Sequence, residues 1–254
     1  MASYNKRGYR PKNKVEEAEV EEQSSTTAEV FNTLDEGASK TEEWVAANQK
    51  YILGVIGVVA VVVLGYLAYN QFVLKPKEAS AANEMYYPQE YFNQAQAATG
   101  ASRDSLYTLA LEGAEGKYGF LNIIEEYSGT KTADLATYSA GMAYLRTQNY
   151  EKAIDYLEDY SSGNLIFGAL AKGGIGDAFM QLDQPKEALG YYEKAVSLEA
   201  NEFTTPRFLY KAGVTALELG DKSKALSYFE RIKDEFSSSE QAATIDVFIG
   251  MAKN

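Results

Sequence analysis

LAKGGIGDAFMQLDQPKEALGYYEKAVSLEA, at residues 170–200, is the stretch that decides the fold, because two other segments repeat it. The earlier copy, residues 135–160, reads LATYSAGMAYLRTQNYEKAIDYLEDY, and the later copy, residues 208–236, reads FLYKAGVTALELGDKSKALSYFERIKDEF. Helix-forming residues dominate all three copies, and no run of alternating strand residues interrupts them. A repeat of this period is typical of solenoids built from stacked structural units.

Small side chains recur at the same places in each copy. Aligned copies match Ala153, Ala188 and Ala225, which are 35 and 37 residues apart. The same alignment matches Gly141, Gly176 and Gly213 with one another, and Leu157, Tyr192 and Phe229. Small residues on both helices of a pair allow a close approach, and the larger side chain one turn later fills the gap. We therefore expect antiparallel helical hairpins that bury their apolar faces by stacking.

These residues resemble the tetratricopeptide repeat family. The middle copy carries I-G-x-x-F at Ile175, Gly176 and Phe179, followed by A-x-x-x-Y-x-x-A at Ala188, Tyr192 and Ala195. The first copy departs from the family at Tyr160, where alanine is usual, and all three copies lack the proline that follows the second helix. The resemblance covers about residues 133–237. It implies an all-α solenoid that binds other proteins and catalyses no reaction.

Helical patterns extend the array on both sides. Residues 105–111 and 118–127 have the pattern of a degenerate first hairpin, and the helix around Phe248 suits a terminal cap. A TPR-like domain is therefore expected at residues 105–254, with about four helical hairpins. Residues 75–104 are expected to form a linker helix, with Pro88 near a turn or a kink.

Ahead of this domain lies an uncharged apolar run. Residues 51–74 read YILGVIGVVAVVVLGYLAYNQFVL, with no charged residue between Lys50 and Lys75. A helix of this length, at ~1.5 Å per residue, is ~36 Å long and crosses a ~30 Å hydrocarbon layer with some tilt. Tyr51 and Tyr69 stand near its ends, where aromatic rings favour the membrane interface. Because a long segment precedes the run, we expect a single transmembrane anchor and not a cleaved signal peptide.

The segment before the apolar run is polar. Residues 1–29 have almost no large apolar side chains, so a disordered cytosolic tail is expected. Its basic cluster, between Lys6 and Lys14, is either a solvated tail or a contact site for anionic lipid or nucleic acid. Residues 30–50 form either an amphipathic juxtamembrane helix or a linker, with a break at Gly37. The basic cluster favours a cytoplasmic N-terminus, which places the C-terminal domain in the periplasm of a bacterial inner membrane.

Composition argues against several classes of function. The chain has no histidine, the side chain that serves most often as a general base or as a ligand of transition metals. It also has no cysteine, and its formal net charge is −12, which disfavours nucleic acid as a partner. Gly173-Gly174-Ile175-Gly176 lacks the third glycine and the preceding strand of a dinucleotide-binding loop, so helix packing explains it better. We therefore expect no enzyme activity, no cofactor and no metal site.

The first helix of each repeat is the usual binding surface of the resembled family. Carried over to this chain, the groove-facing residues are Leu135, Tyr138, Met142 and Leu145 in the first copy, Leu170, Asp177 and Met180 in the second, and Arg207, Tyr210, Val214 and Leu217 in the third. This set is mostly apolar, with adaptable methionines and rigid tyrosines, and it suits loosely specified polypeptide. The alternative is that neighbouring helices or residues 78–98 cover these side chains.

One membrane span followed by four hairpins is also similar to a narrower family, the YfgM-type ancillary subunits of the SecYEG translocon. Residues 117–145, KYGFLNIIEEYSGTKTADLATYSAGMAYL, carry most of this resemblance, and the N-terminal extension is longer than is usual in that family. The resemblance implies an adaptor or holdase for nascent or unfolded polypeptide that pairs with a membrane-anchored periplasmic prolyl isomerase. The alternative function is a structural scaffold that binds one folded partner in an envelope complex.

Overall fold

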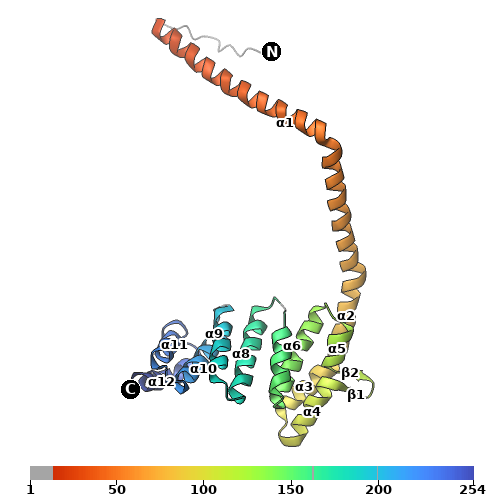
Figure 1. Ribbon diagram of the computed structural model, residues 1–254, viewed down its shortest axis with the longest axis vertical. Helices are drawn as coiled ribbons and strands as arrows, with labels where there is room; N and C mark the ends of the chain where they lie inside the picture. Colours follow the sequence, from red (N-terminus) through yellow and green to blue (C-terminus); the bar gives the residue numbers. More distant parts are fainter. Residues whose placement is uncertain (1–13, 162, 199) are drawn as a thin grey trace. The chain divides into compact units, whose positions relative to one another are not determined.

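The computed structural model describes residues 14–161, 163–198 and 200–254, and side chains from residue 42 onward. It consists of two units, which are divided in sequence between Tyr69 and Asn70. The first unit contains one helix, α1 (Lys14–Tyr69) (Figure 1). Residues 1–13 of the expected disordered tail lie outside the described residues, whereas residues 14–29 belong to α1. The helix also continues through Gly37, because the glutamate- and alanine-rich sequence around it favours helix.

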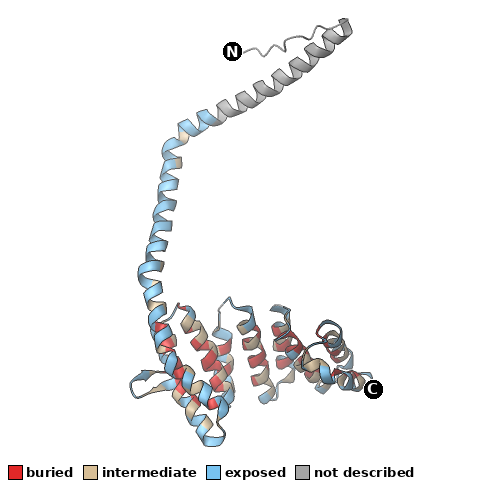
Figure 2. Ribbon diagram, turned by 180° about the vertical axis from the view of Figure 1, so that it is seen from behind, coloured by how far each residue is buried: buried red, intermediate tan, exposed pale blue. Residues whose placement is uncertain are grey.

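The apolar part of α1 has no covering within its own unit. Every residue from 53 to 69 is exposed, and Figure 2 shows this stretch in pale blue. The candidate span found within Glu42–Ala97 includes an 18-residue window with a mean hydropathy of 2.5, none of it buried. By length and composition this helix is able to cross a membrane, and among the described residues no other helix meets that condition.

The second unit is almost entirely helical. It opens with a π-helical turn, η1 (Asn70–Leu74), directly before the segment of Pro76, a residue that has no N–H to donate to the helix ladder. The helices that follow are α2 (Lys75–Glu84), α3 (Tyr86–Ala97), α4 (Gly100–Glu112), α5 (Phe120–Glu126), α6 (Lys131–Arg146), α7 (Tyr150–Asp159), α8 (Leu165–Gln181), α9 (Pro185–Leu198), α10 (Thr205–Glu218), α11 (Lys222–Glu235), the 3₁₀ turn η2 (Gln241–Thr244) and α12 (Ile245–Lys253).

The region expected as a linker helix, residues 75–104, is divided into parts that belong to the folded unit. α2 ends before Met85, and α3 and the start of α4 pack against each other as a hairpin. Met85 of this region shares one buried cluster with Tyr107 of α4 and Phe120 of α5. The apolar side chains of residues 85–97 therefore explain why the fold begins earlier than the repeat pattern indicates.

A two-stranded turn joins α4 to α5, between the two segments whose sequence predicts a helical hairpin. Strands β1 (Gly113–Ala114) and β2 (Lys117–Tyr118) pair antiparallel, with Gly113 opposite Tyr118. The two residues between the strands, Glu115 and Gly116, both have positive φ, as a tight primed turn requires. Gly113 also has a φ of 80°, and a Cβ there would collide with the backbone of Lys117. The turn therefore needs its glycines.

The predicted repeats form the hairpins α6–α7, α8–α9 and α10–α11, which follow one another in Figure 1. The predicted pairing of glycines with larger residues is confirmed. A Cβ on Gly141 would lie 2.6 Å from Leu157 Cγ, and a Cβ on Gly176 would lie 2.6 Å from Tyr192 Cε1. Gly213 is closed off in the same way by Phe229. The all-α solenoid is therefore held by close helix contacts at one repeated position, and its buried residues line the helix interfaces in Figure 2.

The glycines of α8 serve this packing and do not form a phosphate-binding loop. Gly173 lies against the ring of Phe208 on α10, and Gly174 lies against Leu157 of α7. Gly176 contacts Tyr192 of α9. Three helices, α7, α9 and α10, therefore approach α8 closely at its glycines. Each glycine inside a helix costs about 1 kcal/mol of helix propensity relative to alanine, and the close contacts offset that cost.

Candidate functional site

The residues predicted to face a groove lie on the first helices of three hairpins, α6, α8 and α10. All of them are half-buried except Arg207, which is exposed. The apolar members pack against the buried clusters that join neighbouring hairpins. These members are Leu135, Tyr138, Met142, Leu145, Leu170, Met180, Tyr210, Val214 and Leu217. Their side chains therefore contribute to the fold as well as to the surface.

Tyr138 shows how this packing connects two repeats. Its ring meets Phe167 edge to face, with 5.0 Å between the centroids and an interplanar angle of 76°. The centroid of the Tyr160 ring lies 5.6 Å from that of Tyr138. Burial raises the pKa of Tyr138 to about 12, while the positive charge of Arg207 acts in the opposite direction. The ring is engaged by the hairpin contact, so only part of it is available to a ligand.

Asp177 is the centre of a polar network that ties α8 to α9 and α10. Its carboxylate accepts hydrogen bonds from the Lys211 ammonium, at 2.5 and 2.6 Å, and from the Tyr192 hydroxyl, at 2.8 Å. Burial, followed by the charge and the hydrogen bond of Asp177, raises the pKa of Tyr192. The Lys211 ammonium also lies 5.7 Å from the centre of the Tyr192 ring. Asp177 is thus a structural link at the surface where the groove was expected.

A hollow of about 480 Å³ opens beside this network. Its lining comes from six helices, α4, α6, α7, α8, α9 and α10, and it combines apolar and charged side chains. The residues that matter for its chemistry are Arg103 of α4, Leu145 and Arg146 of α6, Asp177 and Met180 of α8, and Lys211 of α10. Three of these six, Leu145, Asp177 and Met180, are among the residues predicted from the sequence. The first helices of successive repeats therefore converge on one concave site.

A second hollow, of about 390 Å³, lies on the other part of α10 and at the start of η2, and it shares Lys211 with the first. Arg207 and Tyr210, also predicted from the sequence, line it together with Phe203, Glu202 and Glu240. The other predicted residues line neither hollow. They are Leu135, Tyr138, Met142, Leu170, Val214 and Leu217.

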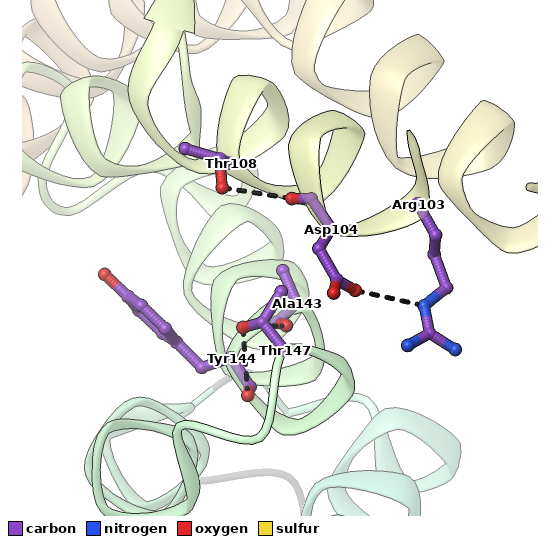
Figure 3. Close-up of polar contacts among 6 residues, drawn as sticks. All are labelled: Arg103, Asp104, Thr108, Ala143, Tyr144 and Thr147. Atoms are coloured by element: carbon purple, nitrogen blue, oxygen red, sulfur yellow. Dashed lines mark hydrogen bonds and ion pairs between the residues drawn. The ribbon is translucent and has the colours of Figure 1, made fainter. Parts of the chain in front are cut away.

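The basic residues of the first hollow were not predicted from the sequence. Arg103 and Arg146 come from different hairpins, and both act on the hydroxyl of Tyr107, where their charges oppose the rise in pKa that burial causes. Figure 3 shows the Arg103 guanidinium extended from α4 beside Asp104, its partner at 3.2 Å. One signal was present in the sequence: of four arginines after residue 100, three line these two hollows.

The end of α6 is fixed by hydrogen bonds next to Arg146, which lines the hollow. Thr147, directly after Arg146, donates its hydroxyl to the carbonyl oxygens of Ala143 and Tyr144, at 3.0 and 3.2 Å (Figure 3). Gln148 follows with a positive φ of 63°, which turns the chain toward α7. Arg146 is the last residue of α6, and the hydrogen bonds of Thr147 fix this end of the helix beside the hollow.

The second helices of the repeats carry a different pattern. The Tyr191 hydroxyl on α9 donates to the Glu158 carboxylate on α7, and the Tyr228 hydroxyl on α11 donates to Glu193 on α9. These positions coincide in the repeat alignment, where Y-x-E recurs at residues 156–158, 191–193 and 228–230. At the end of the array Glu230 is paired with Lys253 of α12, at 3.5 Å. The acidic residues of the second helices thus link one repeat to the next.

The comparison with protein families matches this geometry. Two tetratricopeptide repeat models match the chain, one over residues 136–160 and the other over residues 169–240. The chain carries tetratricopeptide repeats. The matched ranges contain all of α7, α9, α10 and α11 and most of α6 and α8. A comparison with curated proteins gave no match. Tetratricopeptide repeats imply a protein-binding adaptor, and first-helix residues of these repeats line both hollows.

The site offers polar and apolar contacts. No group of three or more acidic, histidine or cysteine side chains arranged for a metal ion occurs among the described residues. Asp177, the carboxylate in the first hollow, already accepts three hydrogen bonds from Lys211 and Tyr192. What the arrangement can do is bind a chain segment through charges, hydrogen bonds and the side chains of Leu145 and Met180.

Proposed function

We propose that this protein is a membrane-anchored, non-catalytic adaptor that holds segments of other polypeptides in the concave site of its tetratricopeptide repeats. The observation that carries the proposal is the hollow of about 480 Å³, to which α4, α6, α8 and α10 each contribute side chains. Of the residues predicted from the sequence, Leu145, Asp177, Met180, Arg207 and Tyr210 are the ones we assign to contact with the bound polypeptide, because they line the two hollows.

The anchor in this proposal is the apolar stretch of α1. Its length, its mean hydropathy of 2.5 and its lack of burial support a single membrane span at residues 51–74. The basic cluster before it supports a cytoplasmic N-terminus and a periplasmic repeat domain in a bacterial inner membrane. Anchoring near a site where chains emerge raises the local concentration of the adaptor, so individually weak contacts suffice.

The resemblance to YfgM-type subunits supports a more specific role at the SecYEG translocon. In that role the repeat domain receives nascent or unfolded polypeptide and works beside a membrane-anchored periplasmic prolyl isomerase. Methionine in the site supports clients of varied sequence, because its side chain adapts to different partners. Membrane lipid surrounds the anchor, and nucleic acid is not among the proposed partners.

Site-specific photocrosslinking in native membranes tests the proposal. A photoreactive amino acid at Met180 is expected to capture polypeptides of varied size, together with subunits of the translocon. The same amino acid at Lys194, an exposed residue on the second helix α9, is the matched control and is expected to capture fewer of them. Equal capture from both positions contradicts a binding site on the first helices.

One observation favours the scaffold as the second candidate function. Most predicted groove residues are packed against neighbouring hairpins, and Tyr138, whose ring contacts Phe167 and Tyr160, is the example. A surface that is already filled suits a folded partner that recognises its shape more than it suits an inserted peptide. One stoichiometric crosslinked partner from Met180, in place of many clients, identifies the scaffold.

A further inference from the structure

Charge is distributed unevenly in this protein. The chain has a formal net charge of −12, yet Arg103, Arg146 and Lys211 contribute three cations to one hollow, against the single carboxylate of Asp177. On the second helices, by contrast, acidic residues such as Glu158 and Glu193 are engaged in the contacts between repeats. A concave site that differs in sign from the rest of the molecule indicates selection for a ligand of negative charge.

The cations of the hollow are not fully neutralised within the fold. Arg146 forms no ion pair with any carboxylate among the described residues. Arg103 pairs only with its neighbour Asp104, and both side chains are substantially exposed, so that pair is weak and water competes with it. Lys211 is the one that has a close internal partner, Asp177. The two arginines are therefore free to form charge-assisted hydrogen bonds with a ligand.

We propose that this hollow recognises an acidic segment of the bound polypeptide, through bidentate contacts of the Arg103 and Arg146 guanidinium groups with glutamate or aspartate side chains. The inference rests on the proposed function and specifies its ligand. Arginine suits this role because its planar group matches the geometry of a carboxylate. Leu145 and Met180, in the same lining, contact the apolar part of the segment. Asp177 lies among the cations and repels a second carboxylate, so it limits how many acidic residues the hollow accepts.

Fluorescence anisotropy of the full chain in detergent tests this ligand chemistry. The probes are a labelled glutamate-rich peptide with an amidated C-terminus, the same peptide with glutamine in place of glutamate, and an uncharged apolar peptide. Arg146→Gln is expected to weaken binding of the glutamate peptide about three- to tenfold, and adding Arg103→Gln weakens it further. Arg231→Gln is the matched control, since it removes the same charge from the outer helix α11, where Arg231 pairs with Glu235. We expect it to leave binding unchanged.

A variant that is expected to change peptide affinity in the opposite direction adds a second test. Asp177→Asn removes the carboxylate from the hollow and is expected to tighten binding of the glutamate peptide, with the fold checked separately by thermal unfolding. Raising the salt concentration is expected to weaken binding of the glutamate peptide and to leave the apolar peptide unaffected.

The outcomes separate this inference from the proposed function. If the glutamate and glutamine peptides bind equally, or if the arginine variants bind the glutamate peptide as the unaltered chain does, the acidic ligand is wrong while binding of the apolar peptide still supports the adaptor. If no peptide binds, the adaptor proposal fails as well. Arg146-dependent binding to vesicles that contain anionic lipid, without binding to the glutamate peptide, assigns the hollow to lipid and overturns the inference.

Discussion

The hydroxyl of Tyr228 on α11 donates a hydrogen bond to the carboxylate of Glu193 on α9, one repeat earlier. The same carboxylate lies 2.7 Å from the ammonium of Lys224. Tyr191 repeats the arrangement with Glu158, so the contact belongs to the repeat and not to one place in it. In a solenoid each repeat touches only its neighbours, and contacts of this kind contribute directly to the interface between them.

Removing the Tyr228 hydroxyl tests this contact. Tyr228→Phe keeps the ring and deletes the donor, so we expect the chain to lose about 1 kcal/mol of unfolding free energy. Tyr150→Phe is the control, because the Tyr150 hydroxyl makes only an exposed contact of 3.3 Å with Gln181. Urea unfolding followed by circular dichroism measures both. A control variant that loses as much as Tyr228→Phe would show that the contact between repeats has no special weight.

Acid is expected to weaken the same interface. Burial opposes ionisation of Glu193, but the hydrogen bonds from Lys224 and Tyr228 and the charge of Lys224 outweigh it and lower the pKa below its ordinary value of 4.5. A lowered carboxyl pKa adds stability that is fully present above pH 4.5 and is lost as the pH falls through the folded-state pKa. The difference in stability between the unaltered chain and Glu193→Gln is therefore expected to be constant near neutral pH and to shrink below pH 4.5. A difference that grows in acid contradicts the assignment.

Substitution by alanine is expected to have opposite effects on stability at two glycines of the α8–α9 hairpin. Gly176→Ala places a Cβ 2.6 Å from Tyr192 and is expected to destabilise the fold by about 1–3 kcal/mol through overpacking. Gly190, inside α9, has open space where a Cβ would stand, with no other atom within 4 Å, so Gly190→Ala is expected to stabilise the helix by about 0.5–1 kcal/mol. Thermal unfolding of both variants distinguishes them by sign, and two changes of the same sign are inconsistent with the packing.

Glu78 connects α2 to the N-terminus of α6 through hydrogen bonds. Its carboxylate accepts hydrogen bonds from the backbone N–H of Lys131, at 2.7 Å, and of Thr132, at 3.0 Å, and from the Thr132 hydroxyl, at 2.5 Å. It thereby occupies the N-terminus of α6, where a negative charge is favourable. We expect Glu78→Ala to cost about 1–2 kcal/mol and to speed hydrogen exchange at Lys131 and Thr132. Glu84→Ala, on the same helix, is the control, and unchanged exchange in Glu78→Ala rules out the cap.

Much of this fold could be predicted from the sequence, because it depends on local volume and period. The contact of Gly176 with Tyr192 is encoded by residue size at a fixed spacing. The equivalent glycine contact is confirmed in all three copies. The beginning of the fold is less evident from the sequence, since residues 85–97 lack the repeat and join the core through the packing of α3 against α4 and the buried cluster around Phe120. The turn at Gly113 is not indicated by the sequence, because strands of two residues leave no alternating pattern.

By itself the sequence determined the class of the protein. An uncharged run of lipid length and three copies of one hairpin pattern specify a candidate anchor and a helical solenoid, because hydrophobic period and side-chain size act locally along the chain. Only the tertiary structure decided that Arg103, Arg146 and Lys211 meet around one hollow. These residues lie on three hairpins, and their convergence depends on the small rotation that each packed interface adds to the next. No single repeat contains that information, so the chemistry of the site became visible only when the repeats were stacked.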